Sequence, residues 1–501
     1  MKQLFSELHR LSHRQPSAPA LMDLSATVSY AGLMNRVELL ANELRQRQVR
    51  VLGLLADNSV TWAITDLAAG AAGIPVVPLP AFFSNGQLAH AIRDAGIDLL
   101  LTDQPERLVS PESSLDLTLT TQFAQCPSSW RAFRVEPAGQ KTLPAGTAKI
   151  TYTSGTTGEP KGVCLSGESL ERVALSLLAR VGPAAVERHL SVLPLATLLE
   201  NIAGLYLPLL AGGLCQLPPL PALGVSGASG LNAAQFVTAL QQHRATSTVL
   251  IPQMLQAIVE QDGHLPDARF LAVGGAPVSP LLLERAAERR LPVFEGYGLS
   301  ECASVVSLNA PETSRAGSVG RPLAHAELRF GADGEIFVRG AVFQGYVNEP
   351  HAPAADGWWP SGDLGYLDGD GFLYLTGRKK NIFITAFGRN VAPEWVEREL
   401  VVEDGIVQAA VFGEASAINV AIVVARPGAG HTDIDSAVRS ANARLPDYAR
   451  VSAWILADSP FTVGNGLLTA TGRPRRHAIL ETYGPRLSPL FESIIPKEQC
   501  A

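Results

Sequence analysis

The sequence has few cysteines and lacks both a basic cluster and a long uninterrupted apolar run. Its five cysteines are an odd number, widely spaced and without a CxxC pair. This pattern argues against a disulfide framework or a zinc site and favours isolated thiols in a reducing compartment. The formal net charge is −7, and no basic stretch is interleaved with aromatic residues. Nucleic acid is therefore not an expected partner, and small metabolites are.

Targeting and membrane signals are also missing. The opening segment, MKQLFSELHRLSHR, carries charges throughout, so it predicts no secretory signal, and we expect a cytoplasmic protein. Residues 201–243 contain no Asp, Glu, Lys or Arg. Proline and glycine nevertheless interrupt this region too often for a membrane-spanning helix, which needs ~20 continuous apolar residues. We expect buried core or a pocket wall there, and no transmembrane segment.

A chain of 501 residues is too long for one hydrophobic core, so a large and a small domain are expected. Short apolar strands separated by helical patterns predict an α/β protein with a mostly parallel sheet. These strands are expected at residues 51–55, 75–77, 98–101, 247–251, 270–273 and 292–294. From Leu170 to Val181 the apolar residues are spaced as on one face of a helix.

The segment ITYTSGTTGEPKGV, residues 150–163, joins a predicted strand to a loop that is suited to holding phosphate. Glycine allows backbone N–H groups to turn toward an anion, hydroxyls donate hydrogen bonds, and lysine adds a positive charge. The segment is not a Walker loop, because no GxxxxGK[ST] pattern is present. The phosphate-binding candidates are Thr153, Ser154, Gly155, Thr156, Thr157, Gly158 and Lys161.

Residues 152–162 resemble the phosphate loop of the adenylate-forming superfamily, which includes acyl-CoA synthetases, nonribosomal adenylation domains and luciferases. The alternative is a flexible Gly/Ser/Thr surface loop. The resemblance implies a large N-terminal domain of layered α/β sheets and a small, mobile α+β C-terminal domain. It also implies ATP and Mg²⁺ as cofactors, with Lys161 as a catalytic cation.

Two further segments carry the same resemblance. The turn 274–277, GGAP, is similar to the adenine-binding segment, and FEGYGLSE, residues 294–301, supplies an aromatic face, a hydroxyl and a carboxylate. By resemblance Tyr297 stacks on adenine, Ser300 contacts the α-phosphate and Glu301 holds magnesium. A buried tyrosine beside a solvated turn is the alternative. The implied nucleotide contacts are Gly275, Ala276, Pro277, Tyr297, Gly298 and Ser300.

The third segment spans SGDLG, residues 361–365, and GRKKN, residues 377–381. By resemblance Asp363 accepts both ribose hydroxyls and Arg378 reaches the ribose and phosphate, although Asp363 could also serve only the turn. Lys380 matches the hinge, so we place the domains at 1–379 and 380–501. In the small domain we expect helices at 393–401 and 433–443 and strands at 407–412, 419–424 and 451–456.

The small domain departs from the family at one position. Where most members have a PTGK-like turn, this chain has TATGR, so Arg473 replaces the expected lysine. An arginine keeps the charge but not the geometry, which puts the efficiency of adenylation in question. Arg475 and Arg476 are interpreted as solvated charges or as part of a coenzyme-phosphate patch. For Arg389 a phosphate contact and a solvated loop position are equally open.

The expected substrate is an apolar carboxylic acid. Amino-acid-activating members carry an aspartate that pairs with the substrate ammonium, and residues 192–201, VLPLATLLEN, have none. Burying an unpaired ammonium there would be costly. Several segments look most like long-chain fatty acyl-CoA synthetases, although Thr197 stands where that group often has histidine. A medium- or long-chain fatty acid is therefore expected.

The resemblance implies a reaction in two steps, adenylation of the acid by ATP and then transfer of the acyl group to the thiol of coenzyme A. Catalysis is assigned to Lys161, Glu301 and Arg473, with no side-chain nucleophile. Two alternatives stay open. The acceptor could be the phosphopantetheine of an acyl carrier protein, or the chain could be a weakened member that only binds nucleotide or acyl-adenylate, for which Arg473 is the only hint.

Overall fold

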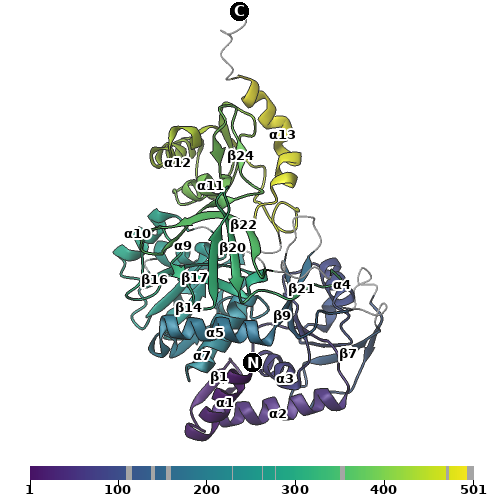
Figure 1. The fold of residues 1–501 in the computed structure, drawn as a ribbon. Helices are drawn as coiled ribbons and strands as arrows, with labels where there is room; N and C mark the ends of the chain where they lie inside the picture. The colour runs from purple at the N-terminus through teal and green to yellow at the C-terminus, as the bar shows by residue number, and fades with distance from the viewer. Residues whose placement is uncertain are drawn as a thin grey trace, which may run out of the picture. The chain divides into compact units, whose positions relative to one another are not determined.

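A computed structural model describes residues 1–108, 115–136, 142–153, 160–227, 230–261, 263–276, 278–349, 356–469 and 473–493. The chain forms two compact units (Figure 1). The first comprises Met1–Gly275, Ala286–Arg329 and Phe337–Trp359, and the second Ala276–Arg285, Phe330–Ile336 and Pro360–Ala501. Because the units are interleaved along the sequence, the domain boundary expected at residue 380 stays a prediction.

An eight-stranded sheet in the first unit carries the predicted phosphate-loop strand. Its middle strands β4, β3 and β5 are parallel, as the alternating pattern predicted. Strands β8 and β9 are antiparallel and place Thr153 opposite Lys161 at the two ends of the loop. In order across the sheet, the strands are β21 (Gly345–Tyr346), β9 (Lys161–Ser166), β8 (Thr147–Thr153), β4 (Val76–Pro78), β3 (Leu52–Leu55), β5 (Leu99–Thr102), β7 (Arg131–Val135) and β6 (Leu117–Leu119).

A nine-stranded sheet in the same unit contains the second predicted run of strands. Strands β14, β15 and β16 are parallel neighbours, which confirms that prediction, and β17 adds an antiparallel strand. In order, the strands are β18 (Arg321–Pro322), β17 (Ser304–Leu308), β16 (Val293–Leu299), β15 (Phe270–Val273), β14 (Ser247–Leu250), β10 (Arg188–Leu190), β11 (Leu214–Gln216), β1 (Pro19–Met22) and β2 (Thr27–Ser29).

The helix after the phosphate loop is α5, Gly167–Val181, and it buries the predicted apolar face. It begins at Ser166, whose hydroxyl accepts a hydrogen bond from the N–H of Ser169. Strand β9, which the sequence did not predict, separates the loop from this helix. The other helices of the unit are α1 (Lys2–Arg14), α2 (Tyr30–Gln46), α3 (Val60–Ala72), α4 (Asn85–Asp94), α6 (Leu198–Glu200), α7 (Leu207–Leu210), α8 (Ala233–Gln242) and α9 (Pro252–Glu260).

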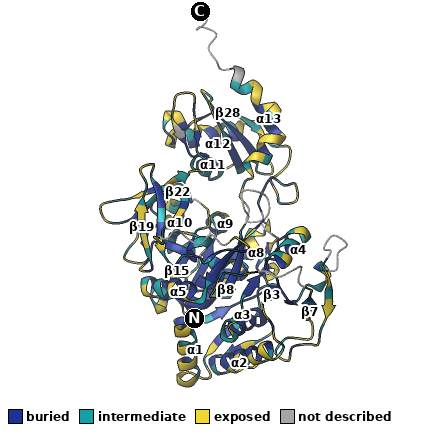
Figure 2. Cartoon of the chain, turned by 45° about the vertical axis from the view of Figure 1, so that its right-hand side comes forward, coloured by how far each residue is buried: buried dark blue, intermediate teal, exposed yellow. Residues whose placement is uncertain are grey.

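The uncharged region begins in buried structure, as expected. A π-helical turn, η3 (Asn201–Tyr206), joins α6 to α7, and residues 198–210 are buried with the exception of Leu199. The strands of this unit, such as β3 and β15, are mostly buried, whereas the outer helices α1 and α2 carry exposed residues (Figure 2). Short segments complete the unit: η1 (Pro105–Arg107), η2 (Pro183–Val186), η4 (Leu220–Leu223), η5 (Ser300–Cys302), β12 (Val225–Ser226) and β13 (Gly230–Leu231).

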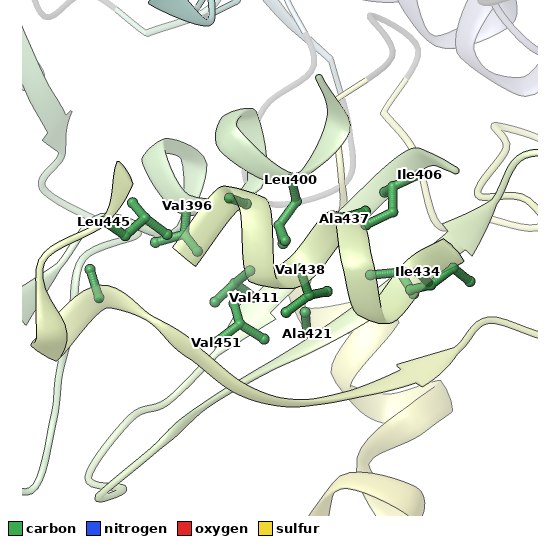
Figure 3. Packing of buried hydrophobic residues seen from close by; sticks show 14 of the residues in the cluster. Val396, Leu400, Ile406, Val411, Ala421, Ile434, Ala437, Val438, Leu445 and Val451 are labelled. Atoms are coloured by element: carbon green, nitrogen blue, oxygen red, sulfur yellow. The ribbon is translucent and has the colours of Figure 1, made fainter. Parts of the chain in front are cut away.

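The second unit contains a three-stranded sheet covered by helices. Helices α11 and α12 pack Val396, Leu400 and Val438 against Val411 of β26 (Figure 3). Strand β27 pairs antiparallel with β26 and parallel with β28. The small-domain elements that the sequence predicted are thereby confirmed. They are α11 (Pro393–Val401), β26 (Ile406–Phe412), β27 (Asn419–Ala425), α12 (His431–Arg444) and β28 (Val451–Leu456).

A final helix, α13 (Arg476–Ser493), was not predicted, and its Ile479 and Tyr483 pack with residues of β27 in a second core cluster. The remaining strands are β19 (Ala326–Phe330), β20 (Glu335–Gly340), β22 (Trp359–Leu367) and β23 (Leu373–Arg378), which form one sheet, and the pair β24 (Phe383–Ile384) and β25 (Asn390–Val391). Helix α10 spans Pro280–Glu288.

Two expectations from composition can be compared with this fold. Across the described ranges, no helix is both long and apolar enough to cross a bilayer. Cys126, Cys164, Cys215 and Cys302 are free thiols, in agreement with their spacing.

Candidate active site

Two of the three predicted catalytic residues, Lys161 and Glu301, come together around one tyrosine. The hydroxyl of Tyr346 donates a hydrogen bond to Oε1 of Glu301 at 2.9 Å. The ammonium of Lys161 lies 5.2 Å from the centre of the same ring, a cation–π distance. Strand pairing explains this arrangement, because β21 carries Tyr346 alongside β9, which begins at Lys161. Burial raises the pKa of Tyr346, and the Glu301 charge adds to the rise, so the phenol stays a donor.

The ammonium of Lys161 has a second partner. It donates to Oε1 of Glu349 at 3.1 Å, and both side chains are about half exposed. Glu349 lies three residues after Tyr346, the last residue of β21, so one short segment supplies both partners of the lysine. Glu349 thus forms an ion pair with the Lys161 ammonium, a cation that is well placed to attract an anionic ligand.

Tyr297, Gly298 and Ser300 lie where β16 ends. A bulge between Tyr297 and Gly298 interrupts the pairing with β17. A Cβ on Gly298 would lie 1.8 Å from the carbonyl oxygen of Ser304, so only glycine fits. Tyr297 is buried, and Gly275 has a φ of +80°, which glycine adopts without strain.

These residues line a cavity of about 150 Å³ inside the first unit. Tyr297, Gly298, Ser300 and Gly275 contribute to its wall, together with the preceding Gly274. The rest of the wall is mainly apolar and includes side chains from α5, α7, β14 and β15. Ser300 therefore connects the cavity with its sequence neighbour Glu301.

Part of the predicted phosphate loop lies outside the described residues. Thr153 is half-buried at the end of β8, and Lys161 is exposed at the start of β9. Ala276 is exposed next to Gly275. The predicted site residues that lie outside the described ranges are Ser154, Gly155, Thr156, Thr157, Gly158 and Pro277.

Asp363 and Arg378 face each other in the second unit. They are partners across the antiparallel strands β22 and β23, and Nε of Arg378 lies 3.2 Å from Oδ1 of Asp363. The guanidinium thereby orients the carboxylate, which is mostly buried. Lys380 is exposed just after β23, and its neighbour Lys379 pairs with Asp333 and Glu335.

The cations of the C-terminal turn differ in environment. Arg473 is exposed, and its backbone N–H donates to Oγ1 of Thr469 at 3.0 Å. Arg389 is also exposed. The interpretation of Arg476 as a solvated charge is wrong, because its guanidinium forms a double hydrogen bond with Glu397, at 2.7 and 2.5 Å. Arg476 begins α13 and Glu397 lies on α11, so the pair ties two helices of the small domain together.

Comparison with known proteins establishes the family. Residues 8–347 match the model of the AMP-binding enzyme family. A feruloyl-CoA synthase of Amycolatopsis sp. is 31% identical and is aligned over 91% of this chain and 95% of its own length. The chain belongs to the AMP-binding enzyme family.

Other relatives extend the comparison. A long-chain-fatty-acid–CoA ligase of Mycobacterium bovis is 28% identical, with 86% of each chain covered. The o-succinylbenzoate CoA synthetase of Bacillus subtilis, solved with its acyl-adenylate intermediate, has a TM-score of 0.75 at 24% identity and covers 94% of this chain and 97% of that one. This likeness confirms the predicted fold class.

The family implies a magnesium ion, and the described residues fit one that is bound through a single carboxylate together with the phosphates of ATP. Within the described ranges, no group of three or more His, Cys, Asp or Glu side chains could hold a metal. Mg²⁺ in nucleotide sites is bound through one or two carboxylates together with phosphate oxygens and water. A single carboxylate such as Glu301, held by Tyr346, suits a metal that arrives with ATP.

Sequence reasoning missed Tyr346 and Glu349. The segment GYVNE, residues 345–349, lies between the segment 294–301 and the segment 361–365 and matches no motif that the sequence pointed to. An aromatic residue followed by an amide and a carboxylate is unremarkable by itself. Only the pairing of β21 with β9 reveals that this segment lies next to the phosphate-loop lysine.

Proposed function

We propose that this chain activates an apolar carboxylic acid with ATP and transfers the acyl group to the thiol of coenzyme A. Its enzyme class is that of the AMP-forming acid–CoA ligases. One observation carries the proposal. Lys161 and Glu301 meet at Tyr346, and Ser300, next to Glu301, lines a cavity with mainly apolar walls. The charges suited to a triphosphate thus adjoin a space suited to an apolar acid.

In the first step, a carboxylate oxygen of the acid bonds to the α-phosphorus, and the bond from that phosphorus to the pyrophosphate oxygen breaks. Lys161 neutralises charge on the phosphate oxygens, and Glu301 would hold a magnesium ion that would supply further neutralisation. In the second step, the thiolate sulfur of coenzyme A bonds to the acyl carbon, the bond from that carbon to the phosphate oxygen breaks, and AMP leaves with that oxygen. No side chain of the protein forms a covalent bond in either step.

The other residues have supporting roles in this proposal. Tyr297, Gly298, Gly275 and Ala276 bind the adenine side, and Ser300 contacts the α-phosphate. Asp363, oriented by Arg378 at 3.2 Å, accepts the ribose hydroxyls. The loop residues Thr153 to Gly158 and Pro277 complete the nucleotide contacts. Lys380 is the hinge between domains 1–379 and 380–501, and Arg473 assists adenylation.

For the acid, we propose a medium- or long-chain fatty acid, which the apolar cavity wall and the fatty-acid ligase among the relatives support. An aromatic acid is the second candidate. It is supported by the compact cavity of about 150 Å³ and by relatives named for feruloyl and 2-succinylbenzoate groups. Coenzyme A is the proposed acceptor, with an acyl carrier protein as the alternative.

The test is ATP–pyrophosphate exchange with a panel of fatty, aromatic and amino acids. We expect magnesium-dependent exchange with fatty or aromatic acids and none with amino acids, because the aspartate that pairs with the substrate ammonium in amino-acid-activating members is missing from residues 192–201. Formation of an acyl-CoA or an acyl carrier protein adduct then identifies the acceptor. Absence of exchange with every acid would overturn the enzymatic proposal and favour a nucleotide-binding role.

A further inference from the structure

Among the described residues that line the cavity, His189 and Tyr297 are the ionisable ones. Tyr297 belongs to the proposed adenine site, whereas His189 is not among the proposed nucleotide contacts. It lies on β10, and its side chain is almost completely buried. A histidine in a mainly apolar wall calls for a chemical reason, because burying a polar ring is costly unless its nitrogens are satisfied.

Both ring nitrogens of His189 are held by the protein. Nδ1 lies 2.9 Å from Oγ of Ser247 on β14, and Nε2 lies 3.1 Å from Oε1 of Glu200 at the end of α6. The imidazole therefore has one fixed orientation, and it fixes one oxygen of the Glu200 carboxylate in turn. The same arrangement places a fully buried carboxylate directly behind the cavity wall.

The other carboxylate oxygen of Glu200 is not satisfied. Oε2 is buried and has no hydrogen-bond partner among the described residues. An unsatisfied buried acceptor is destabilising, and more so when it is charged. The next residue in the chain, Asn201, gives the contrast: its amide belongs to a buried network with Lys149 and Asp66 in which the ammonium has three oxygen partners. The amide of Asn201 is thus hydrogen-bonded within this network, whereas Oε2 of the preceding residue, Glu200, has no partner among the described residues.

The absence of a side chain at Gly204 makes room for the Glu200 carboxylate and its histidine partner. A Cβ on Gly204 would lie 2.1 Å from Oε1 of Glu200 and 2.8 Å from Nε2 of His189, so a larger residue would disrupt the pair. Gly204 lies in the π-helical turn η3, and such turns are frequent at functional sites. Leu199 and Ala203, which flank Glu200 and Gly204 in the chain, both line the cavity.

We propose that Glu200, oriented by His189, selects an acid that carries a hydroxyl group on its acyl portion, and that Oε2 accepts a hydrogen bond from that hydroxyl. This inference rests on the proposed function, in which the cavity receives the acid. A hydroxyl supplies the one donor that the buried carboxylate lacks, and the rest of the acyl group contacts the apolar wall. A methyl ether of the same acid fills the space but donates nothing.

The test needs no variant at first. Two series of acids are compared by the kcat/KM of pyrophosphate exchange: 3-phenylpropenoic acid with its 4-hydroxy and 4-methoxy derivatives, and octanoic acid with its 8-hydroxy and 8-methoxy derivatives. We expect the hydroxy acid of at least one series to be preferred over both partners by at least about 10-fold, as for a hydrogen bond to a charged group. Equal rates, or a preference for the ether or the unsubstituted acid in both series, would overturn the inference.

Variants then assign the preference to Glu200. Glu200→Gln keeps the size but removes the charge, and we expect it to reduce the hydroxyl preference several-fold while exchange with the unsubstituted acid persists. Thr248→Val is the matched control, since Thr248 lines the cavity and its hydroxyl already donates to the carbonyl of Leu190 at 2.8 Å. It should leave the preference unchanged. Activation of unsubstituted acids without any hydroxyl preference contradicts only this inference, whereas no exchange with any acid contradicts the proposed function itself.

Discussion

Tyr346 and Glu301 are joined by a hydrogen bond of 2.9 Å from the phenol to the carboxylate, and the ring of the same tyrosine lies under the ammonium of Lys161. One side chain thus contacts both groups that are proposed to act on the triphosphate. The bond fixes one oxygen of Glu301 and thereby orients the carboxylate that is proposed to hold magnesium.

Tyr346→Phe removes this bond and keeps the ring. A hydrogen bond to a charged group is worth roughly 1.5–3 kcal/mol, but Tyr346 is only half-buried, so we expect the lower end. The Mg²⁺ concentration for half-maximal pyrophosphate exchange should rise by about 10-fold at unchanged thermal stability. Tyr366→Phe, the same change at an exposed tyrosine, is the control. An unaltered Mg²⁺ dependence means that Tyr346 has only a packing role.

Glu349→Gln should release Lys161. The carboxylate competes with the phosphates of ATP for the ammonium, so its removal should lower the KM for ATP. Because the pair is half exposed, its strength is about 0.2–1 kcal/mol, and the change should be about two- to fivefold. The effect should shrink as ionic strength rises, since salt screens exposed charges. A higher KM in the variant would instead show that Glu349 helps to bind the nucleotide.

Arg473→Ala should slow adenylation more than thioester formation from supplied acyl-adenylate. A cation beside the reacting phosphate is proposed to contribute on the order of 10-fold or more to adenylation. Arg473→Lys restores the residue type of most family members and should keep the rate. Arg475→Ala is the control, since Arg475 is exposed in the same turn. If Arg473→Ala leaves adenylation unchanged, the catalytic charge comes from Lys161 and magnesium alone.

The sequence predicted those parts of the fold that depend on local patterns. The parallel strands β3, β4 and β5 and the small-domain elements could be read from apolar spacing and turn residues, because each signal lies within one element. Pairings between distant segments could not be predicted in this way. Tyr346 and Glu301 lie 45 positions apart and meet through an arrangement of strands that no local pattern records.

The misjudged Arg476 shows the same limit. Its neighbours in the sequence are arginine and histidine, which suggested a solvated charged segment. Its actual partner, Glu397, lies 79 positions earlier on α11. No local pattern carries the information that α13 returns to this helix.

Arg476→Ala should therefore destabilise the small domain. Burial raises the pKa of Glu397 and the Arg476 charge opposes the rise, so removal of the arginine leaves a buried carboxyl without its ionic partner. Breaking such a pair typically costs about 3–5 kcal/mol. Faster hydrogen–deuterium exchange in peptides of α11 and β26 would report the loss, with Arg475→Ala as the exposed control. Unchanged protection of both elements contradicts the prediction.

Stability should also depend on pH through His325. Burial lowers the pKa of this histidine from 6.5 to about 4. Between these pH values the unfolded chain binds a proton at His325 that the folded chain does not. The contribution of His325 to the free energy of unfolding is therefore fully present above pH 6.5 and is lost as the pH falls toward 4. From pH 7 to pH 5 this single group should lower the free energy of unfolding by about 2 kcal/mol.

His325→Gln cannot gain this charge, so its unfolding free energy should fall less than that of the wild type over the same pH range. Urea unfolding at pH 7, 6 and 5 measures the difference. His264→Gln, at an exposed histidine of the same unit, should retain the wild-type slope. If wild type and His325→Gln lose stability in parallel, His325 titrates normally in the folded chain, and the acid sensitivity must come from other groups.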